Sequence, residues 1–231
     1  MKTYLITGAA QGLGRALTLN LANNGNQLIL LDKDATTLNL FYDDLMANFE
    51  CEVILLPMDL LGANPDHYND VSQSLQTSVK QLDAVFLNAA FLPACTPIEH
   101  FKIERWYESL QINLNANFHL IQAVLPMLKQ TESSKLIAML DENIKQHPAN
   151  YGVYGVAKAG LEQLMKSLAA ENDKPHCYLA NLPAFQSNTR SKQFPSENPN
   201  TIATAESIAK QLVAELFKNT LNKPNKLIKK L

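Results

Sequence analysis

The chain has 231 residues, of which 46% are hydrophobic and 18% are charged, and its formal net charge is −2. This length supports one large domain with a sizeable core, and the charge balance lacks the positive excess of a general nucleic-acid binder. The three cysteines form no CxxC pair and the five histidines show no metal-ligand spacing, which argues against a disulfide framework and a zinc site. No apolar run approaches the roughly 18 residues of a membrane span. We therefore expect a cytoplasmic, unexported protein that binds no nucleic acid, membrane or metal.

Short β-rich runs alternate with longer stretches of helical spacing, which predicts βαβ units and a parallel sheet. The predicted strands are Thr3–Thr7, Gln27–Leu31, Glu52–Pro57, Asp83–Asn88, Lys135–Leu140 and His176–Asn181. Most are apolar throughout, as expected when helices cover both faces of a sheet. The predicted helices span residues 12–24, 35–48, 66–80, 103–130, 151–171 and 205–219. The pattern indicates an α/β fold, with one domain over residues 1–231.

Two segments fall outside this alternation. Residues 183–203 are polar, include Pro195 and Pro199, and have no steady period, so we expect a long loop that covers a substrate site. The lysine-rich tail at residues 218–231 is expected to be a solvated end, with residues 226–230 as an optional seventh strand at the sheet edge.

A glycine-rich turn, Gly8-Ala9-Ala10-Gln11-Gly12-Leu13-Gly14, lies between the first predicted strand and the first predicted helix. Glycine permits a tight turn in which backbone N–H groups approach a pyrophosphate, and the helix N-terminus adds partial positive charge. The spacing differs from GxGxxG, and a glycine turn between a strand and a helix is often only a turn. Taken alone, the segment therefore leaves a phosphate cradle and a plain turn equally open.

Asp32 ends the second predicted strand, where a carboxylate can accept hydrogen bonds from the hydroxyls of an adenosine ribose. It would repel a ribose 2′-phosphate, and Gln11 carries no charge that attracts one, so NAD(H) is favoured over NADP(H). Lys33 weakens this preference. The alternative is that Asp32 caps the helix that begins near Asp34.

Tyr154 and Lys158 are four residues apart in a predicted helix, which places a phenol and an ammonium group on one face. A neighbouring cation favours the phenolate, so Lys158 is expected to lower the pKa of Tyr154 toward a useful acid/base range. Taken alone, a tyrosine and a lysine at this spacing are more often surface residues without a catalytic role. Tyr151 is a rival phenol, but the residue four positions on is Gly155.

Together these motifs resemble the short-chain dehydrogenase/reductase family, in the family's order and over nearly the whole chain. Residues 7–14 match its TGxxxGxG turn, Asp32 its acidic residue and Tyr154 with Lys158 its YxxxK pair. The remaining matches are Asp59-Leu60, Asn88-Ala89-Ala90, Asn113 and Asn181-Leu182-Pro183-Ala184. The resemblance implies a doubly wound Rossmann domain with strand order 3-2-1-4-5-6.

The resemblance also implies hydride transfer between a nicotinamide ring and a carbonyl or alcohol carbon of a small molecule. Tyr154 would exchange the proton, Lys158 would bind the nicotinamide ribose, and Asn113 would hold a water of the proton relay. Other cofactor contacts would come from Gly8, Gln11, Gly12, Leu13, Gly14, Asp32, Lys33, Asp59, Leu60, Asn88, Ala89, Ala90 and Pro183. In this family two helices commonly pair between subunits, which implies a homodimer or homotetramer.

The match breaks at Asp141, which stands where the family places a serine that polarises the substrate carbonyl. A serine hydroxyl donates a hydrogen bond to oxygen as negative charge builds, whereas a carboxylate accepts only. Asp141 should also oppose Lys158 by raising the pKa of Tyr154. Phe91 and Ala184, at positions where the family has glycine, are smaller departures near the cofactor.

Four interpretations of Asp141 stay open: it is protonated and donates, it binds a cationic substrate, it marks an inactive site, or it turns away to cap locally. The leading hypothesis is an NAD-dependent oxidoreductase that Asp141 weakens. The alternatives are a dinucleotide-binding regulatory or sensor protein, and a reductase of imines or pteridine-type substrates.

Overall fold

The computed structural model describes residues 1–22 and 25–217. It contains one six-stranded sheet of order β3-β2-β1-β4-β5-β6, in which every neighbouring pair is parallel. The strands are β1 (Thr3–Thr7), β2 (Gln27–Asp32), β3 (Glu52–Pro57), β4 (Ala84–Leu87), β5 (Lys135–Asp141) and β6 (His176–Leu182). The predicted α/β class and strand order are confirmed, and the strand limits differ by two residues or fewer. The optional strand at residues 226–230 lies outside the described residues.

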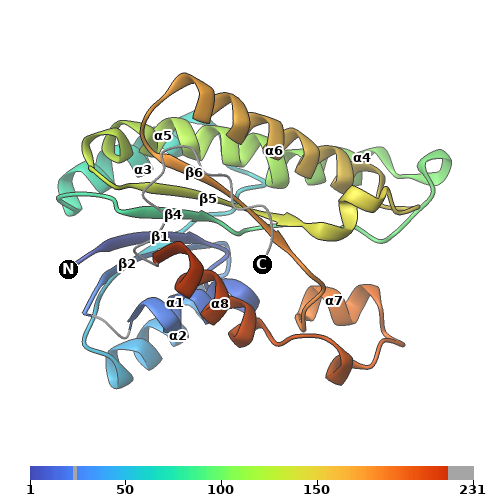
Figure 1. Ribbon diagram of the computed structural model, residues 1–231, viewed down its shortest axis with the longest axis horizontal. Coiled ribbons are helices and arrows are strands. Elements are labelled where there is room, and N and C mark those ends of the chain that lie inside the picture. Colours follow the sequence, from blue (N-terminus) through green and yellow to red (C-terminus); the bar gives the residue numbers. More distant parts are fainter. Residues whose placement is uncertain (23–24, 218–231) are drawn as a thin grey trace.

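Helices cover both faces of the sheet (Figure 1). On one face lie α1 (Gly12–Ala22), α2 (Ala35–Asn48) and α8 (Ala205–Phe217). On the other lie α3 (Pro65–Ser78), α5 (Ala116–Gln130) and α6 (Gly152–Glu171), with α4 (Ile103–Leu110) at one end of this layer. Among the described residues, no helix is long and apolar enough to cross a membrane.

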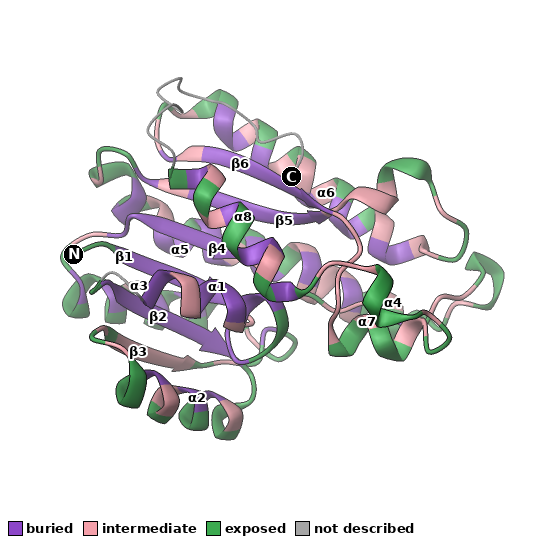
Figure 2. Cartoon of the chain, turned by 60° about the horizontal axis from the view of Figure 1, so that its bottom comes forward, coloured by how far each residue is buried: buried purple, intermediate pink, exposed green. Residues whose placement is uncertain are grey.

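The strands are apolar throughout because successive side chains enter the two separate cores. In β1, Ile6 packs in the core under α1 and α8, and its neighbour Leu5 packs under α3, α5 and α6. Both side chains are fully buried. Edge strand β3 is only partly covered, which the burial colouring of Figure 2 shows beside the buried central strands. This two-sided burial explains why a strand of alternating polarity is absent from the sequence pattern.

The long helix predicted for residues 103–130 is interrupted. A π-helical turn, η2 (Gln111–Asn115), separates α4 from α5. Such turns insert one extra residue into the hydrogen-bond ladder and often occur at functional sites. The hydrophobic spacing did not reveal it, because a π turn shifts the helical face without interrupting the run of apolar residues.

The segment predicted as a loop at residues 183–203 contains two short helices. They are α7 (Asn188–Gln193), capped by the Ser187 side chain, and the 3₁₀ turn η4 (Pro199–Thr201). The expectation of an irregular segment was therefore partly wrong. Six residues are too few to show helical periodicity, so the only signal for α7 in the sequence is the capping residue Ser187.

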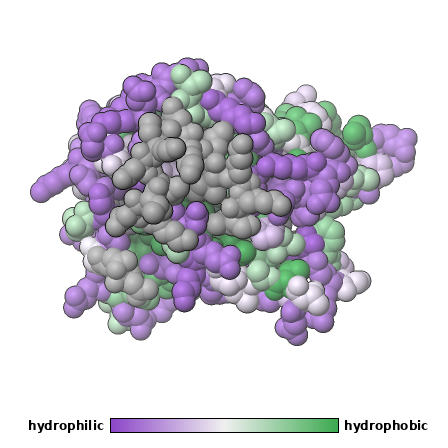
Figure 3. Space-filling view, viewed as in Figure 1, coloured by the Kyte–Doolittle hydropathy of each residue, from purple (hydrophilic) through white to green (hydrophobic). Residues whose placement is uncertain are grey.

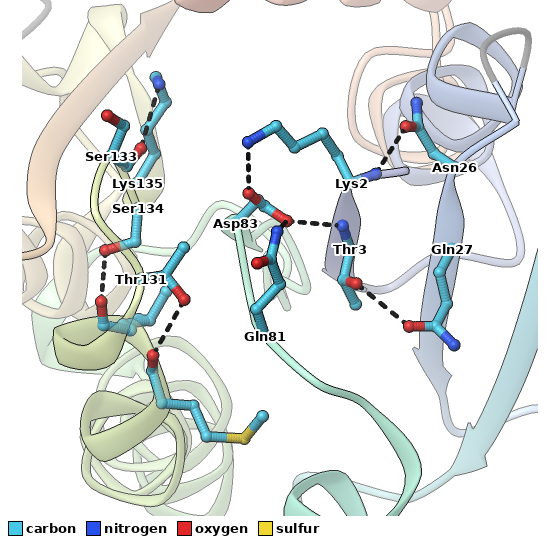
Figure 4. A network of polar contacts seen from close by, with 12 residues as sticks. Lys2, Thr3, Asn26, Gln27, Gln81, Asp83, Thr131, Ser133, Ser134 and Lys135 are labelled. Atoms are coloured by element: carbon cyan, nitrogen blue, oxygen red, sulfur yellow. Dashed lines mark hydrogen bonds and ion pairs between the residues drawn. The ribbon is translucent and has the colours of Figure 1, made fainter.

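A polar network ties the sheet together at the end where the strands begin (Figure 4). The Asp83 carboxylate accepts hydrogen bonds from the Thr3 backbone N–H at 2.9 Å, from Lys2 Nζ at 2.8 Å and from Gln81 Nε2 at 2.8 Å. Thr3 Oγ1 in turn donates to Gln27 Oε1 at 3.1 Å. The network joins β1, β2 and the start of β4. It lies at the opposite end of the strands from their carboxyl ends, where the candidate site is found.

Candidate active site

The glycine-rich turn joins β1 to α1 and is built so that only glycine fits at its tightest point. Gly8 and Gly12 adopt positive φ values of 64° and 52°. A Cβ atom at Gly14 would lie 2.0 Å from the Gly8 carbonyl oxygen and 2.8 Å from Asn88 Nδ2. The start of α1 therefore approaches the backbone of the turn directly, as a pyrophosphate cradle requires.

Two neighbouring strands hold this turn in place. Asp32, at the end of β2, accepts a hydrogen bond from the Ala10 backbone N–H at 2.9 Å through Oδ2. Asn88, at the end of β4, donates through Nδ2 to the carbonyl oxygens of Thr7 at 2.9 Å and Gly8 at 3.2 Å. Asp34, rather than Asp32, is the residue that caps α2. Asp32 is thus a brace of the turn.

A cavity of about 310 Å³ opens at this edge of the sheet. Every predicted cofactor residue lines it except Gly14, which packs against the backbone of Gly8 instead. Tyr154, Lys158 and Asp141 line the same cavity, which therefore runs from the glycine turn to the predicted reactive pair. Within residues 1–22 and 25–217, no cluster of three or more His, Cys, Asp or Glu side chains could hold a metal ion.

Tyr154 and Lys158 lie at the start of α6, both almost fully buried. Lys158 Nζ donates a hydrogen bond to the Met139 carbonyl oxygen of β5 at 2.8 Å, and it lies 5.7 Å from the centroid of the Tyr154 ring. Burial lowers the pKa of Lys158 to about 8, against an opposing contribution from Asp141. The predicted pair is therefore assembled, with the ammonium near the face of the phenol ring.

The predicted lowering of the Tyr154 pKa is wrong for this structure. Burial raises the pKa of Tyr154 well above its ordinary value, and the charges of Asp141 and Tyr151 raise it further. The four-residue spacing correctly placed the two side chains on one face. It could not show that the phenol loses its water and that the ammonium turns toward Met139, because both depend on tertiary packing.

Asn113 lies within the π-helical turn and is fully buried. Its side chain accepts a hydrogen bond from the Phe91 N–H at 3.0 Å and donates to the Phe91 carbonyl at 2.7 Å. Its own carbonyl oxygen accepts from Asn117 Nδ2 at 2.9 Å. These contacts make Asn113 a brace for the segment that follows β4, and its role in holding a water stays a prediction.

Asp141 ends β5 and caps locally, as one of its four interpretations expected, but it does not turn away from the cavity. Its Oδ1 accepts a hydrogen bond from the Asn143 N–H at 2.8 Å and so caps the short 3₁₀ turn η3 (Glu142–Gln146). The side chain nevertheless lines the cavity beside Tyr154 and raises the pKa of that phenol. The local cap therefore does not remove the carboxylate from the candidate site.

Tyr151 and Arg190 line the cavity although neither was predicted as a site residue. Tyr151 was set aside as a rival phenol, but its ring lies edge-to-face with Tyr154, with centroids 6.2 Å apart. Arg190, on α7, lines the same cavity. The spacing of Tyr151 from Tyr154 was a usable signal, because residues three apart share a helix face. Arg190 gave none.

The segment between β6 and α8 closes one side of the cavity. Gln193, the last residue of α7, donates through Nε2 to the carbonyl oxygens of Leu92 at 3.1 Å and Pro93 at 3.0 Å. These bonds join α7 to the segment that follows β4. On the face in Figure 3, hydrophobic residues lie among hydrophilic ones at this end of the molecule, near α4 and α7. The cavity thus has a polar turn at one end and a mixed surface at the other.

A family model described as short chain dehydrogenase matches residues 2–189, which contain the glycine turn, Asp32, Asn113 and the Tyr154–Lys158 pair. The chain belongs to this family. The oxidoreductase YciK from Escherichia coli K12 is 27% identical over 204 residues, which cover 88% of this chain and 81% of YciK. The family resemblance stated from the sequence is confirmed.

Two solved structures of short chain dehydrogenases superpose closely. One is from Shigella flexneri 2a, complexed with NADP, at a TM-score of 0.90 and 26% identity. The other is from Escherichia coli CFT073, complexed with NADPH, at a TM-score of 0.90 and 25% identity. Each alignment covers 98% of this chain and 95% of the other.

Proposed function

We propose that this protein is a nicotinamide-dinucleotide-dependent oxidoreductase that interconverts a small carbonyl compound and its alcohol. One observation carries the proposal: a single cavity joins the glycine turn at Gly8 to the buried Tyr154–Lys158 pair. A phosphate cradle at one end and a proton-exchanging phenol at the other are the two components that such a reaction needs.

The residues present fit a dinucleotide. The contact between Gly14 and Gly8 leaves no space for a side chain, so the N–H groups of the turn can approach a pyrophosphate. The carboxylate of Asp32, which braces the turn and lines the cavity, would accept hydrogen bonds from an adenosine ribose. On this basis we propose NAD(H) as the preferred cofactor, although the two superposed relatives hold NADP and NADPH and Lys33 also lines the cavity.

When bound, the dinucleotide would donate a hydride to a carbonyl carbon or accept one from an alcohol carbon. Tyr154 would give its proton to the substrate oxygen in the reductive direction, since its raised pKa keeps the phenol protonated. Lys158, held by the Met139 carbonyl, would stabilise the phenolate that remains and return a proton to it. Asn113 would fix the position of the segment at Phe91 beside the nicotinamide end.

Asp141 favours a second candidate function. A carboxylate beside the reacting oxygen disfavours the charge that develops in carbonyl reduction, whereas it stabilises a cationic C=N group. Its Oδ1 caps η3, and among the described residues no hydrogen bond to Oδ2 is seen, so this oxygen is available to a substrate. The second candidate is therefore a reductase of imines or pteridine-type compounds at the same site.

The test is a panel of aldehydes, ketones and protonated imines with NADH and NADPH, followed by the absorbance of the reduced dinucleotide. We expect carbonyl turnover in the wild type, no turnover in Tyr154→Phe, and a gain of about 10- to 100-fold in Asp141→Ser, less than the about 10²- to 10³-fold that one transition-state donor contributes. Preference for imines, lost in Asp141→Ser, would select the second candidate. Dinucleotide binding without turnover in any variant would select the regulatory or sensor protein. No dinucleotide binding at all would overturn the carbonyl reductase, the imine reductase and the sensor alike.

The quaternary structure is also a proposal. Ile103 and Tyr107 of α4 and Val156 of α6 are large apolar side chains with exposed fractions of 55%, 64% and 51%. They lie on helices of one layer, and α4 contacts α6 directly. We propose that this surface pairs with a second copy of the chain as a homodimer or as part of a homotetramer in the cytoplasm, which light scattering and a Tyr107→Glu variant would test.

A further inference from the structure

We propose that the Tyr151 hydroxyl donates the hydrogen bond to the substrate oxygen that a serine at position 141 would have supplied, and that Arg190 holds Tyr151 in place for it. This inference rests on the proposed function and names a further catalytic residue and a positioning residue of the same site.

The first step is the place of Tyr151 in the cavity. It is the N-cap residue of α6, and its carbonyl oxygen accepts a hydrogen bond from Gly155 N–H at 2.9 Å, which ties its backbone to the first turn of the helix. Its ring meets that of Tyr154 at an interplanar angle of 63°. Both phenols line the same cavity with Asp141. A substrate oxygen that reaches the Tyr154 hydroxyl therefore enters the surroundings of a second phenol.

The second step is the guanidinium group of Arg190. Its Nε and Nη2 bind both oxygens of Glu197, at 2.8 and 2.7 Å, and its side chain lies over the Phe194 ring at 4.0 Å. This two-pronged ion pair within the α7 segment holds the guanidinium in a fixed orientation on the cavity wall. Arg190 lines the same cavity as Tyr151, and its charge opposes the rise in the pKa of that phenol.

The third step is the direction of the hydrogen bonds. A guanidinium only donates, so a phenol oxygen that accepts from Arg190 keeps its own O–H for another acceptor. Burial, followed by the charge of Asp141, raises the pKa of Tyr151 despite the opposing effect of Arg190, so the phenol stays protonated at neutral pH. The O–H of Tyr151 is therefore available to donate to a substrate oxygen.

The two phenols then have different roles in carbonyl reduction. A hydride would pass from a C–H bond of the reduced dinucleotide, leaving the dinucleotide oxidised, to the carbonyl carbon. The π electron pair of C=O would move to the oxygen, which would take the Tyr154 proton. Tyr151 keeps its proton and stabilises the developing negative charge through its hydrogen bond. Only Tyr154 has a lysine four residues on, so only Tyr154 is resupplied with a proton through Lys158.

The test is a double-mutant cycle between Tyr151 and Asp141 on the best carbonyl substrate. We expect Tyr151→Phe to lower kcat by about 10²- to 10³-fold in the wild-type background, because one oxyanion donor is lost. In Asp141→Ser, where the new hydroxyl can donate, the same change should cost less than about tenfold. Tyr42→Phe, which removes a hydroxyl from a tyrosine of α2 outside the cavity, is the matched control and should change nothing.

A second readout is independent of turnover. The infrared C=O stretch of the carbonyl substrate, bound with the oxidised dinucleotide, should shift to higher frequency in Tyr151→Phe because a donor to the oxygen is lost. Arg190→Gln should produce part of that shift, and Glu197→Gln, which keeps the guanidinium, a smaller part. Binding of the dinucleotide should be the same in all three variants.

Each outcome decides the inference. Equal losses for Tyr151→Phe in both backgrounds, or an unchanged C=O stretch, would overturn it while turnover by the wild type keeps the proposed function. Turnover in Asp141→Ser but not in the wild type would overturn it as well, because Tyr151 would then not replace the serine. No turnover in either protein would overturn the proposed function together with the inference.

Discussion

The ammonium group of Lys158 donates to the main-chain carbonyl of Met139 at 2.8 Å, from a side chain that is almost completely enclosed between α6 and β5. This contact sets the chemistry of the candidate site. Burial disfavours the charged form of lysine, and it lowers the pKa to about 8. Lys158 is therefore charged below about pH 8 and neutral above it, within the range in which an enzyme is assayed.

The rate of carbonyl reduction should follow the charge of Lys158. We expect kcat/KM to be level at neutral pH and to fall about tenfold per pH unit above about pH 8, because the ammonium that stabilises the Tyr154 phenolate is lost. The raised pKa of Tyr154 keeps that phenol protonated over the same range. Initial rates at constant ionic strength measure the profile. In Lys158→Arg, whose side chain stays charged, a remaining fall near pH 8 would assign it to another group.

The glycine turn should tolerate a methyl group at Gly12 far better than at Gly14. At Gly14 a Cβ would lie 2.0 Å from a backbone oxygen, so α1 or the turn must move. At Gly12 no atom lies within 4 Å of the added carbon, and the cost of its positive φ is about 1–2 kcal/mol. We expect Gly14→Ala to lower the free energy of unfolding by more than Gly12→Ala does. Urea unfolding measures both, and equal losses would contradict the close approach.

Asp32 should control which dinucleotide binds. Asp32→Asn keeps an oxygen that can accept from the Ala10 N–H but removes the negative charge that would repel a ribose 2′-phosphate. We expect the ratio of the Kd values for NADPH and NADH to fall about tenfold, with little change in stability. Fluorescence titration of each dinucleotide measures the ratio. An unchanged ratio would move the discrimination to other residues, with Lys33→Ala as the companion variant.

Asp83 should affect stability without affecting the site. Its carboxylate accepts from the buried Thr3 N–H and from Lys2 and Gln81, at the edge of the sheet where the strands begin. Asp83→Ala leaves the Thr3 donor unpaired, so we expect a loss of about 1–3 kcal/mol in the free energy of unfolding. Asp83→Asn, which keeps one acceptor oxygen, should lose less. The Kd for the dinucleotide should stay constant, and a change in it would show coupling across the sheet.

The pattern of the sequence by itself determined the parallel sheet, the limits of its strands and the edge at which the site forms, while the strand order came from the family resemblance of the motifs. Six apolar runs separated by helical stretches admit few arrangements other than a parallel sheet covered on both faces, because connections between parallel strands must cross over the sheet. The carboxyl ends of parallel strands lie at one edge, so the residues that follow β1, β2, β4 and β5 had to meet there. Asp32 and Asn88 are at that edge for this reason.

Only the tertiary structure decided how charge is distributed at that edge. The spacing of Tyr154 and Lys158 gives a shared helix face, but the direction of each pKa shift depends on water exclusion and on the nearby charge of Asp141. The same is true of Tyr151 and Arg190, which come to one cavity from segments separated by β6. Burial and long-range contacts have no local pattern in a sequence, whereas periodicity and turn chemistry do.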